Sequence, residues 1–516
     1  MYRLGIDVGG TNTDAVIIDE NLKVVAQTKT PTTEDVYGGI VGVLAKVLEC
    51  SGIDRTQIRQ AMLGTTQCTN AIVERKNLAR IGVMRIGAPA TLGILPMVDW
   101  AEDLKAVAEE IEVIGGGFEY DGKAIASLDE EAARSFFQRC KAKGLKSIAI
   151  SGVFSTVRDD NEQEAARICR EVMGDDVHIS VSSKIGSMGL IERENATILN
   201  AALYKVARSF TESFAKSLAE QGVTNAAVYF SQNDGTLMNE DYARKYPILT
   251  IACGPTNSIR GASYLSRLSD AVVIDIGGTT TDIGILQNGF PRESSVAVTV
   301  GGVRTNFRMP DIISIGLGGG SIVREKDGNV TVGPDSVGYR ITEKALVFGG
   351  DTLTATDIAV RLGYADIGDP SKAAHIDEAL ANKAMSRIVE MVEENVDAMK
   401  VSSEDVDVVL TGGGSILLSG RLAGARQLLK PENFAVANAI GSAISKVSGT
   451  YEKLVSYDAT PREQALENAK REAIEMAVRS GAKAETVEII DVEDVPLAYH
   501  PGNTCRVKIK AAGELA

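Results

Sequence analysis

The sequence predicts a mixed α/β protein built from two similar halves. The first observation is a repeated motif: residues 6–14 read IDVGGTNTD and residues 274–282 read IDIGGTTTD, identical at seven of nine positions. Second, β-branched residues before and after the Gly-Gly pair of each copy predict two strands joined by a tight turn. Third, strand and helix patterns alternate over residues 128–182, which favours a parallel or mixed sheet.

Strands and helices of the first half follow from periodicity and turn residues. The expected strands are 3–8, 14–18, 22–28, 80–86, 147–151 and 178–182, and the expected helices are 35–49, 128–143 and 159–173. Residues 61–76 read as a strand end, a turn and a helix. Residues 88–117 are glycine-rich and predict an irregular, mobile loop. Residues 184–221 are mostly helical, with the polar cluster 192–195 expected to face solvent.

The second half contains a glycine-rich turn that could lie against a ligand. Residues 405–416 predict a strand ending in Gly412, Gly413, Gly414 and Ser415, where backbone without side chains lets a flat base or a ribose approach. Residues 312–322 are also glycine-rich but lack the G-x-G-x-x-G spacing, which excludes a Rossmann-type dinucleotide site. The other expected elements are a strand at 226–231, a strand, Gly-Pro turn and helix over 250–259, helices at 375–400 and 436–447, a tail helix opened by a capping box at 460–463, and strands at 487–491 and 506–510.

Each copy of the motif combines groups that suit phosphate and magnesium. The glycines are expected to adopt φ > 0, so that backbone N–H groups and threonine hydroxyls line the turn as donors for phosphate oxygens. Asp7 and Asp275 are hard oxygen ligands, and we expect them to hold Mg²⁺ mainly through its waters. Asp14 and Asp282 either orient a nucleophile or brace the hairpin. The expected phosphate-binding residues are Gly9, Gly10, Thr11, Asn12 and Thr13 in the first copy, and Gly277, Gly278, Thr279, Thr280 and Thr281 in the second.

Composition limits the function classes. The 516 residues are 44% apolar and 24% charged, which is ordinary for a globular protein of two to four domains. The net charge of −15 argues against nucleic acid or an anionic membrane as a partner. No apolar run reaches membrane-spanning length, and the first motif leaves no room for a signal peptide. The six cysteines form no CxxC pair and the three histidines are far apart, which predicts reduced thiols, a cytoplasmic location and no zinc site.

The order of these features resembles that of the actin-like ATPase superfamily, which includes actin, sugar kinases and heat-shock chaperones. The two motifs, a linking segment, the turn at 411–415 and the small-residue helix at 436–447 follow one another as in those proteins. The resemblance implies two ribonuclease-H-like domains around an ATP cleft, with phosphates on both loops and residues 412–415 against the adenosine. We therefore expect domains at 1–183 and 184–447, and a small α/β appendage at 448–516.

A closer resemblance extends over nearly the whole chain up to about residue 447. The motifs GIDVGGTNTDAV, GTTQCTNAIVER, IERENATILNAAL, FSQNDGTLM, CGPTNSIRGA, IISIGLGGGSIV and VANAIGSAI together look like the A-type subunit of the hydantoinase/oxoprolinase family. The resemblance implies ATP-dependent opening of a cyclic amide, such as 5-oxoproline or a hydantoin, by phosphorylation of the amide oxygen and attack of water on the activated carbon. It also implies a distinct B-type partner subunit.

Other functions stay open because a shared fold does not fix function. The chain could be an ATP-driven conformational or activating subunit of a partner enzyme, including an ATP-dependent carboxylase. It could also be a small-molecule kinase that releases a stable phosphoester. The sequence does not identify the ring.

Overall fold

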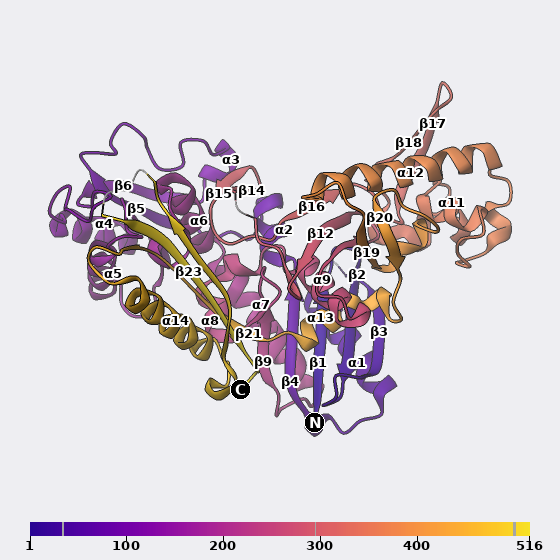
Figure 1. Cartoon of the computed structure of the whole chain (residues 1–516), viewed down its shortest axis with the longest axis horizontal. Helices are drawn as coiled ribbons and strands as arrows, with labels where there is room; N and C mark the ends of the chain where they lie inside the picture. Colours follow the sequence, from indigo (N-terminus) through magenta and orange to yellow (C-terminus); the bar gives the residue numbers. More distant parts are fainter. Residues whose placement is uncertain (34–35, 295, 499–501) are drawn as a thin grey trace.

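In the computed structural model, two sheets repeat one strand order, and each carries one copy of the duplicated motif (Figure 1). The structure describes all residues except 34–35, 295 and 499–501. The first order is β3-β2-β1-β4-β9, and the second is β16-β12-β11-β19-β20. In each, the first three strands along the chain are antiparallel and the last two run parallel to the first. The strands are β1 Tyr2–Val8, β2 Asn12–Ile18, β3 Val24–Pro31, β4 Ile58–Thr65, β9 Ala227–Ser231, β11 Ala271–Ile276, β12 Thr281–Gln287, β16 Ile312–Ile315, β19 Val406–Thr411 and β20 Ala425–Leu429.

The two sheets have separate hydrophobic cores. The first is covered by α1 (Val36–Ser51) and α7 (Tyr204–Glu220), and the expected start of α1 at residue 35 lies outside the described residues. The second packs against α11 (Ala355–Arg361) and α12 (Glu378–Met399). Strands β1 and β11 are buried almost throughout, as their runs of β-branched residues predict. The mixed α/β class and the two similar halves are therefore confirmed.

A third, four-stranded parallel sheet is inserted between β4 and β9. Its order is β6-β5-β7-β8, and α4 and α5 pack on it. The expectation that residues 88–117 form an irregular loop is wrong in part, because β6 lies within them. That strand, β6, is acidic, and its glutamates pair with Arg80, Arg139 and Lys143, so an apolar pattern could not reveal it. The bounds are β5 Ile81–Ala88, α3 Glu102–Lys105, β6 Ala108–Gly115, α4 Glu130–Ala142, β7 Ser147–Gly152, α5 Asp160–Met173 and β8 His178–Val181.

The polar cluster at 192–195 does not face solvent, contrary to expectation. It lies in α6 (Leu190–Ala202), where Glu194 is 1% exposed. Glu194 accepts a hydrogen bond from Nε of buried Arg85 at 2.7 Å. Asn195 accepts one from Nε1 of Trp100, also at 2.7 Å. Buried charges require such partners, and these lie on distant segments that the local pattern cannot show.

Two helices cross between the sheets. Helix α9 (Cys253–Ser266) contacts β11, β12 and β19, and α13 (Ala437–Ile444) contacts β1, β2 and β4. The expected strand before the Gly-Pro pair is wrong, because Pro247–Thr250 forms a 3-10 turn and Gly254 and Pro255 lie in the first turn of α9. Proline is tolerated there since the first helical N–H groups have no partner within the helix.

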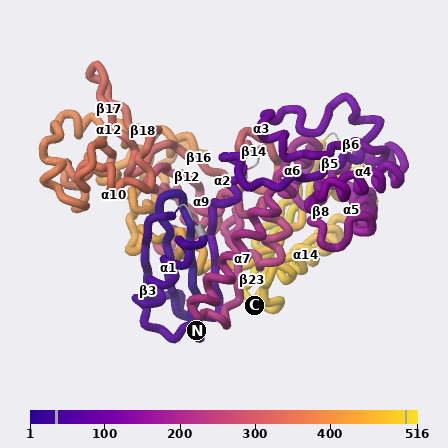
Figure 2. The backbone as a smooth tube through the Cα atoms, turned by 180° about the vertical axis from the view of Figure 1, so that it is seen from behind, coloured from indigo at the N-terminus to yellow at the C-terminus, as the bar shows by residue number. Residues whose placement is uncertain are grey.

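The tail strands extend the first sheet. Strands β21 (Val447–Ser456), β23 (Thr504–Gly513) and β22 (Glu488–Pro496) continue it beyond β10 (Leu237–Asn239), and α14 (Arg462–Arg479) packs on β21 and β23. Both termini lie close together at the lower edge of the molecule, near the middle of its long axis (Figures 1 and 2). The expected capping box at 460–463 is wrong: the N-cap is Pro461, which has no side-chain donor or acceptor. Thr354 and Asp357 form such a box at α11 instead.

The remaining elements are short. They are α2 Gln67–Glu74, α8 Glu240–Lys245, β13 Phe290–Pro291, β14 Val298–Val300, β15 Val303–Thr305, β17 Ser321–Lys326, β18 Asn329–Ser336 and α10 Ile341–Lys344. In the part of the chain that the structure describes, no helix has the length and apolar character needed to cross a bilayer.

Candidate active site

The two copies of the motif meet in space. Each turn is closed by one backbone bond, from Gly9 N to Asn12 O at 3.0 Å and from Gly277 N to Thr280 O at 2.9 Å. The hydroxyl oxygens of Thr11 and Thr279 are 3.2 Å apart, although these residues are 268 positions apart in the chain. The duplication therefore builds a single site with one loop from each half.

The tips of both loops carry unused donors. No hydrogen bond of the described residues has the backbone N–H of Gly10, Thr11, Gly278 or Thr279 as its donor. The carbonyl oxygens of the second loop are occupied, since Gly319 N donates to Gly277 O and Gly320 N to Gly278 O, at 3.0 and 2.7 Å. Successive unpaired N–H groups of this kind form an anion-binding concavity.

Not every threonine of the motif is free to contact a ligand. The Thr13 hydroxyl is buried 3.2 Å from that of Thr32, and the Thr281 hydroxyl donates to the Leu317 carbonyl at 2.7 Å. These two side chains brace the loops from below. The glycine-rich stretch at 312–322 lies against the second loop and orients it. This is the stretch whose glycine spacing excludes a Rossmann-type dinucleotide site.

Gly278 serves close packing between the loops, and none of the four motif glycines has an unusual backbone angle. Gly9, Gly10, Gly277 and Gly278 all have φ outside the positive region, so the expected φ > 0 is wrong. A Cβ on Gly278 would lie 2.7 Å from the Thr11 methyl group, so a side chain there would force the loops apart. The small size of glycine allows the two loops to touch.

Two helices hold the leading aspartates. Asn257 Nδ2 of α9 donates to Asp7 Oδ1 at 3.0 Å, and Asn438 Nδ2 of α13 donates to Asp7 Oδ2 at 3.4 Å. The Ser258 hydroxyl contacts Asp275 Oδ2 and lies 2.6 Å from Asn438 Oδ1. Asp7 and Asp275 are thus joined across the two halves through Asn438 and Ser258, and Asn257 holds Asp7 in addition.

Glycines at the ends of β4 and β19 make room for the same carboxylates. A Cβ on Gly64 would lie 2.3 Å from Asp7 Oδ1, and one on Gly412 would lie 2.2 Å from Asp275 Oδ1. Gly412 has φ +81°, which also favours glycine. The turn of residues 412–415 lies beside the second loop, where a Cβ on Gly414 would come within 2.6 Å of Gly277 O. The Ser415 hydroxyl is buried there, and no described residue hydrogen-bonds to it.

Burial raises the pKa of all four motif aspartates. The pKa of Asp14 rises to about 7 through burial, although the Lys29 ammonium 3.1 Å away lowers it. The pKa of Asp282 also rises to about 7 through burial, against the hydrogen bond from Ser314. The other two aspartates are raised in the same direction by the same cause. Burial therefore favours the protonated form of these carboxyls unless a positive charge lies beside them.

These residues fit a divalent cation bound through water. Among the described residues, no three His, Cys, Asp or Glu side chains form a direct metal-ligand cluster. Asn257 Oδ1, beside Asp7, is buried and accepts no hydrogen bond from the residues that the structure describes. Carboxylate and amide oxygens suit Mg²⁺, which keeps several waters when bound.

The raised pKa values predict a pH-dependent stability in EDTA. A carboxyl whose pKa is about 7 when folded and about 3.8 when unfolded binds more protons in the folded state between these values. Its stabilising contribution is therefore lost as pH rises through 7. We expect the melting temperature to fall between about pH 5 and about pH 8, and to fall less in the double variant D14N/D282N. Equal pH slopes for the two proteins would contradict the assignment.

Several site residues were not predicted. Asn257, Ser258 and Asn438 are polar side chains in helices of small residues, and that contrast is the only local signal for them. Lys29 could not be placed because the β2–β3 register shifts between Ile17 and Ile18, and a one-residue shift moves a side chain to the other face.

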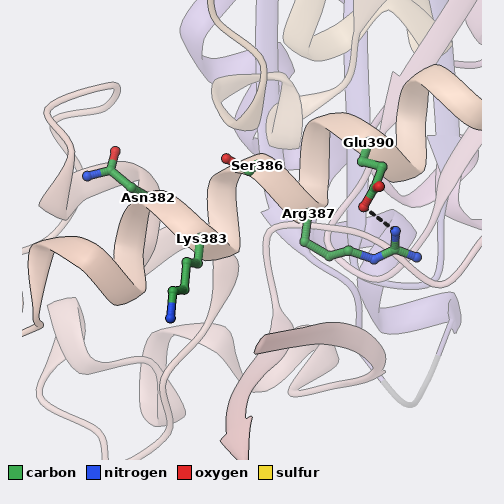
Figure 3. A pocket seen from close by; sticks show the side chains of 5 residues that line it. All are labelled: Asn382, Lys383, Ser386, Arg387 and Glu390. Atoms are coloured by element: carbon green, nitrogen blue, oxygen red, sulfur yellow. Dashed lines mark hydrogen bonds and ion pairs between the residues drawn. The ribbon is translucent and has the colours of Figure 1, made fainter. Parts of the chain in front are cut away.

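A surface pocket on α12 takes no part in this site. It is lined by Asn382, Lys383, Ser386, Arg387 and Glu390, all from one side of a single helix (Figure 3). None of these residues belongs to the motifs or to the 412–415 turn. The pocket therefore does not add to the candidate active site.

The fold and the site together define a class of protein. Two ribonuclease-H-like halves that each contribute one β-hairpin loop to a shared site form the architecture of actin, sugar kinases and heat-shock chaperones. Within this class, the chain belongs to the hydantoinase/oxoprolinase family. The family's N-terminal-region model matches residues 3–173, and its hydantoinase/oxoprolinase model matches residues 193–409. The resemblance drawn from the motifs is confirmed.

Relatives with assigned names include several enzymes. The chain is 26% identical to caprolactamase subunit alpha of Pseudomonas jessenii, over 70% of this chain and 54% of that one. It is 28% identical to 5-oxoprolinase of Saccharomyces cerevisiae (70% and 31%), and 26% identical to the acetophenone carboxylase gamma subunit of Aromatoleum aromaticum (70% and 53%). It thus spans about half or less of their lengths. A crystal structure of ATP-dependent caprolactamase from Pseudomonas jessenii has the same fold, with a TM-score of 0.80, 20% identity and coverage of 100% and 88%.

Proposed function

We propose that this chain binds ATP with Mg²⁺ where its two loops meet, and uses the γ-phosphoryl group to open a cyclic amide. The observation that carries the proposal is the contact between Thr11 and Thr279, surrounded by unused backbone donors and four carboxylates. Donors of this kind bind phosphate oxygens, while carboxylates hold the cation that accompanies them. Relatives named caprolactamase and 5-oxoprolinase support a cyclic amide as substrate class.

The roles of the residues follow from their positions. The unused N–H groups of Gly10, Thr11, Gly278 and Thr279 hold the phosphates. Gly412, Gly413, Gly414 and Ser415 lie against the adenosine. Asp7 and Asp275 hold the cation through its waters, and Asp14 and Asp282 support them from the second strand of each hairpin. Magnesium, when bound, supplies positive charge to the transferring group. Phosphoryl transfer needs such positioning and charge neutralisation more than covalent protein chemistry.

Phosphorylation solves a chemical problem of the substrate. A lactam is stabilised by resonance and reacts slowly with water. Transfer of the γ-phosphoryl group to its oxygen, with ADP leaving, makes the ring carbon a strong electrophile for water. Water adds to that carbon, and the ring C–N bond breaks as the nitrogen takes a proton. A second water then releases inorganic phosphate from the resulting acyl phosphate. We propose a B-type partner subunit for the complete reaction, since relatives are named as alpha and gamma subunits. We also propose a cytoplasmic location, and domains at 1–183, 184–447 and 448–516.

The test is ATP hydrolysis by the purified chain with magnesium and a panel of cyclic amides. Phosphate and ring-opened product should appear in equal amounts with one ring. If the chain binds ATP but does not turn it over, adding the partner subunit should start turnover. A phosphorylated product that accumulates would indicate a kinase instead, and absence of ATP binding would refute the proposal.

A carboxylase subunit is the second candidate. The acetophenone carboxylase gamma subunit is about as similar to this chain as the two amidases are. The same assay distinguishes it, because turnover would then depend on bicarbonate and a ketone, and no ring would open.

A further inference from the structure

The two halves of the site differ at one position of an otherwise matching row. Residues paired across neighbouring strands have side chains on the same face of a sheet. In the first half, Asp7 pairs with Asp14, and Asp14 pairs with Lys29 of β3. In the second half, Asp275 pairs with Asp282, and Asp282 pairs with Ser314 of β16. The strand that follows each hairpin thus contributes a lysine in one half and a serine in the other.

This difference separates charge across the site. Lys29 Nζ is 3.1 Å from Asp14 Oδ1, and within the described residues it makes the only ion pair to any of the four aspartates. The Ser314 hydroxyl hydrogen-bonds to Asp282 Oδ1 and carries no charge. Among the described residues, the carboxylates of the first half have one direct ammonium partner and those of the second half have none, although the Lys29 charge also lowers the pKa of Asp275.

Lys29 also reaches toward the other half. A Cβ built on Gly413 would lie 3.8 Å from Lys29 Nζ, which places the ammonium group beside the 412–415 turn. The Lys29 side chain is 32% exposed, so it is accessible to a ligand between the loop and the turn. An ammonium group on a flexible stem is a point charge suited to phosphate oxygens.

We propose that the duplicated site is polarised: Lys29 contacts the phosphoryl oxygens, and the cation between Asp7 and Asp275 lies closer to Asp275, which Asp282 supports. This inference rests on the proposed function, because it assumes that a nucleotide and a cation share the site. A cation is attracted to two carboxylates without a counter-charge and repelled by a nearby ammonium group. The two halves therefore have different tasks, although their loops are nearly identical in sequence.

The test exchanges the two differing residues. We expect K29S to weaken ATP binding in EDTA about tenfold, as expected for loss of one charge-assisted contact. Mn²⁺ binding without nucleotide, followed by electron paramagnetic resonance, should be unchanged or tighter in K29S. In S314K, Mn²⁺ binding should weaken about tenfold, because an ammonium group now lies beside Asp282. The matched control is K23S, since Lys23 is exposed and outside the row.

K29R keeps the charge and should restore most of the ATP affinity, which separates a phosphate contact from a loss of folding. Unchanged ATP affinity in K29S, or unchanged Mn²⁺ affinity in S314K, would overturn the inference. If the wild-type chain binds no ATP, the proposed function fails. The Mn²⁺ comparison of wild type and S314K then still decides on which half the cation binds.

Discussion

Replacing Asp275 by asparagine should lower magnesium-dependent ATP turnover by a factor of about 100 or more, the usual effect of removing one preorganised electrostatic group. Asp275 lies at the end of β11, beside the second loop, and contacts the Ser258 hydroxyl. An amide of the same shape keeps that contact but cannot supply the charge that holds a cation. Turnover measured over a range of magnesium concentrations checks this prediction.

The same substitution should not destabilise the protein. Burial raises the pKa of Asp275, so the folded state bears a cost for its charge. We therefore expect an equal or higher melting temperature for D275N at about pH 8, together with the loss of turnover. The matched control is D327N, because Asp327 is exposed in the turn between β17 and β18. Full magnesium-dependent turnover in D275N would show that Asp275 has no role in the site.

The sequence was most informative where local pattern and function coincide. The two loops could be found because the donors, the threonines and both aspartates lie within nine residues of each other. Buried strands could also be located, since runs of β-branched residues mark them. Residues 192–195 could not be placed in this way. Their polar pattern predicted exposure to solvent, but Arg85 and other distant groups pair with them, so this part of the helix is buried.

The support of the loops depends on tertiary contacts that no short window contains. Asn257 and Asn438 are close to Asp7 only because α9 and α13 cross between the sheets. The crossing itself depends on glycines whose role is steric. In the sequence, a glycine within a helical pattern indicates only a less stable helix. It does not indicate that a second helix packs against that position.

The crossing of α9 and α13 should be the point most sensitive to a single added methyl group. A Cβ on Gly441 would lie 1.9 Å from the Asn257 carbonyl oxygen and 2.9 Å from Gly261 N, and backbone atoms cannot move aside as a flexible side chain does. We expect G441A to lower the free energy of unfolding by about 3 kcal/mol, the upper range for overpacking a buried contact. Urea unfolding checks this value.

G441A should also weaken ATP binding at the candidate site, whereas a substitution elsewhere in the core should lower stability alone. To accept the methyl group, α9 and α13 must move apart, and this displaces Asn257 from Asp7 and Ser258 from Asn438. ATP affinity should therefore fall even at temperatures where the variant is fully folded. G42A is the matched control: Gly42 is exposed within α1 with open space around it, so alanine should stabilise that helix by up to about 1 kcal/mol. Normal stability of G441A would mean that the helices tolerate a wider spacing, and that the close crossing does not fix the distance between Asp7 and Asp275.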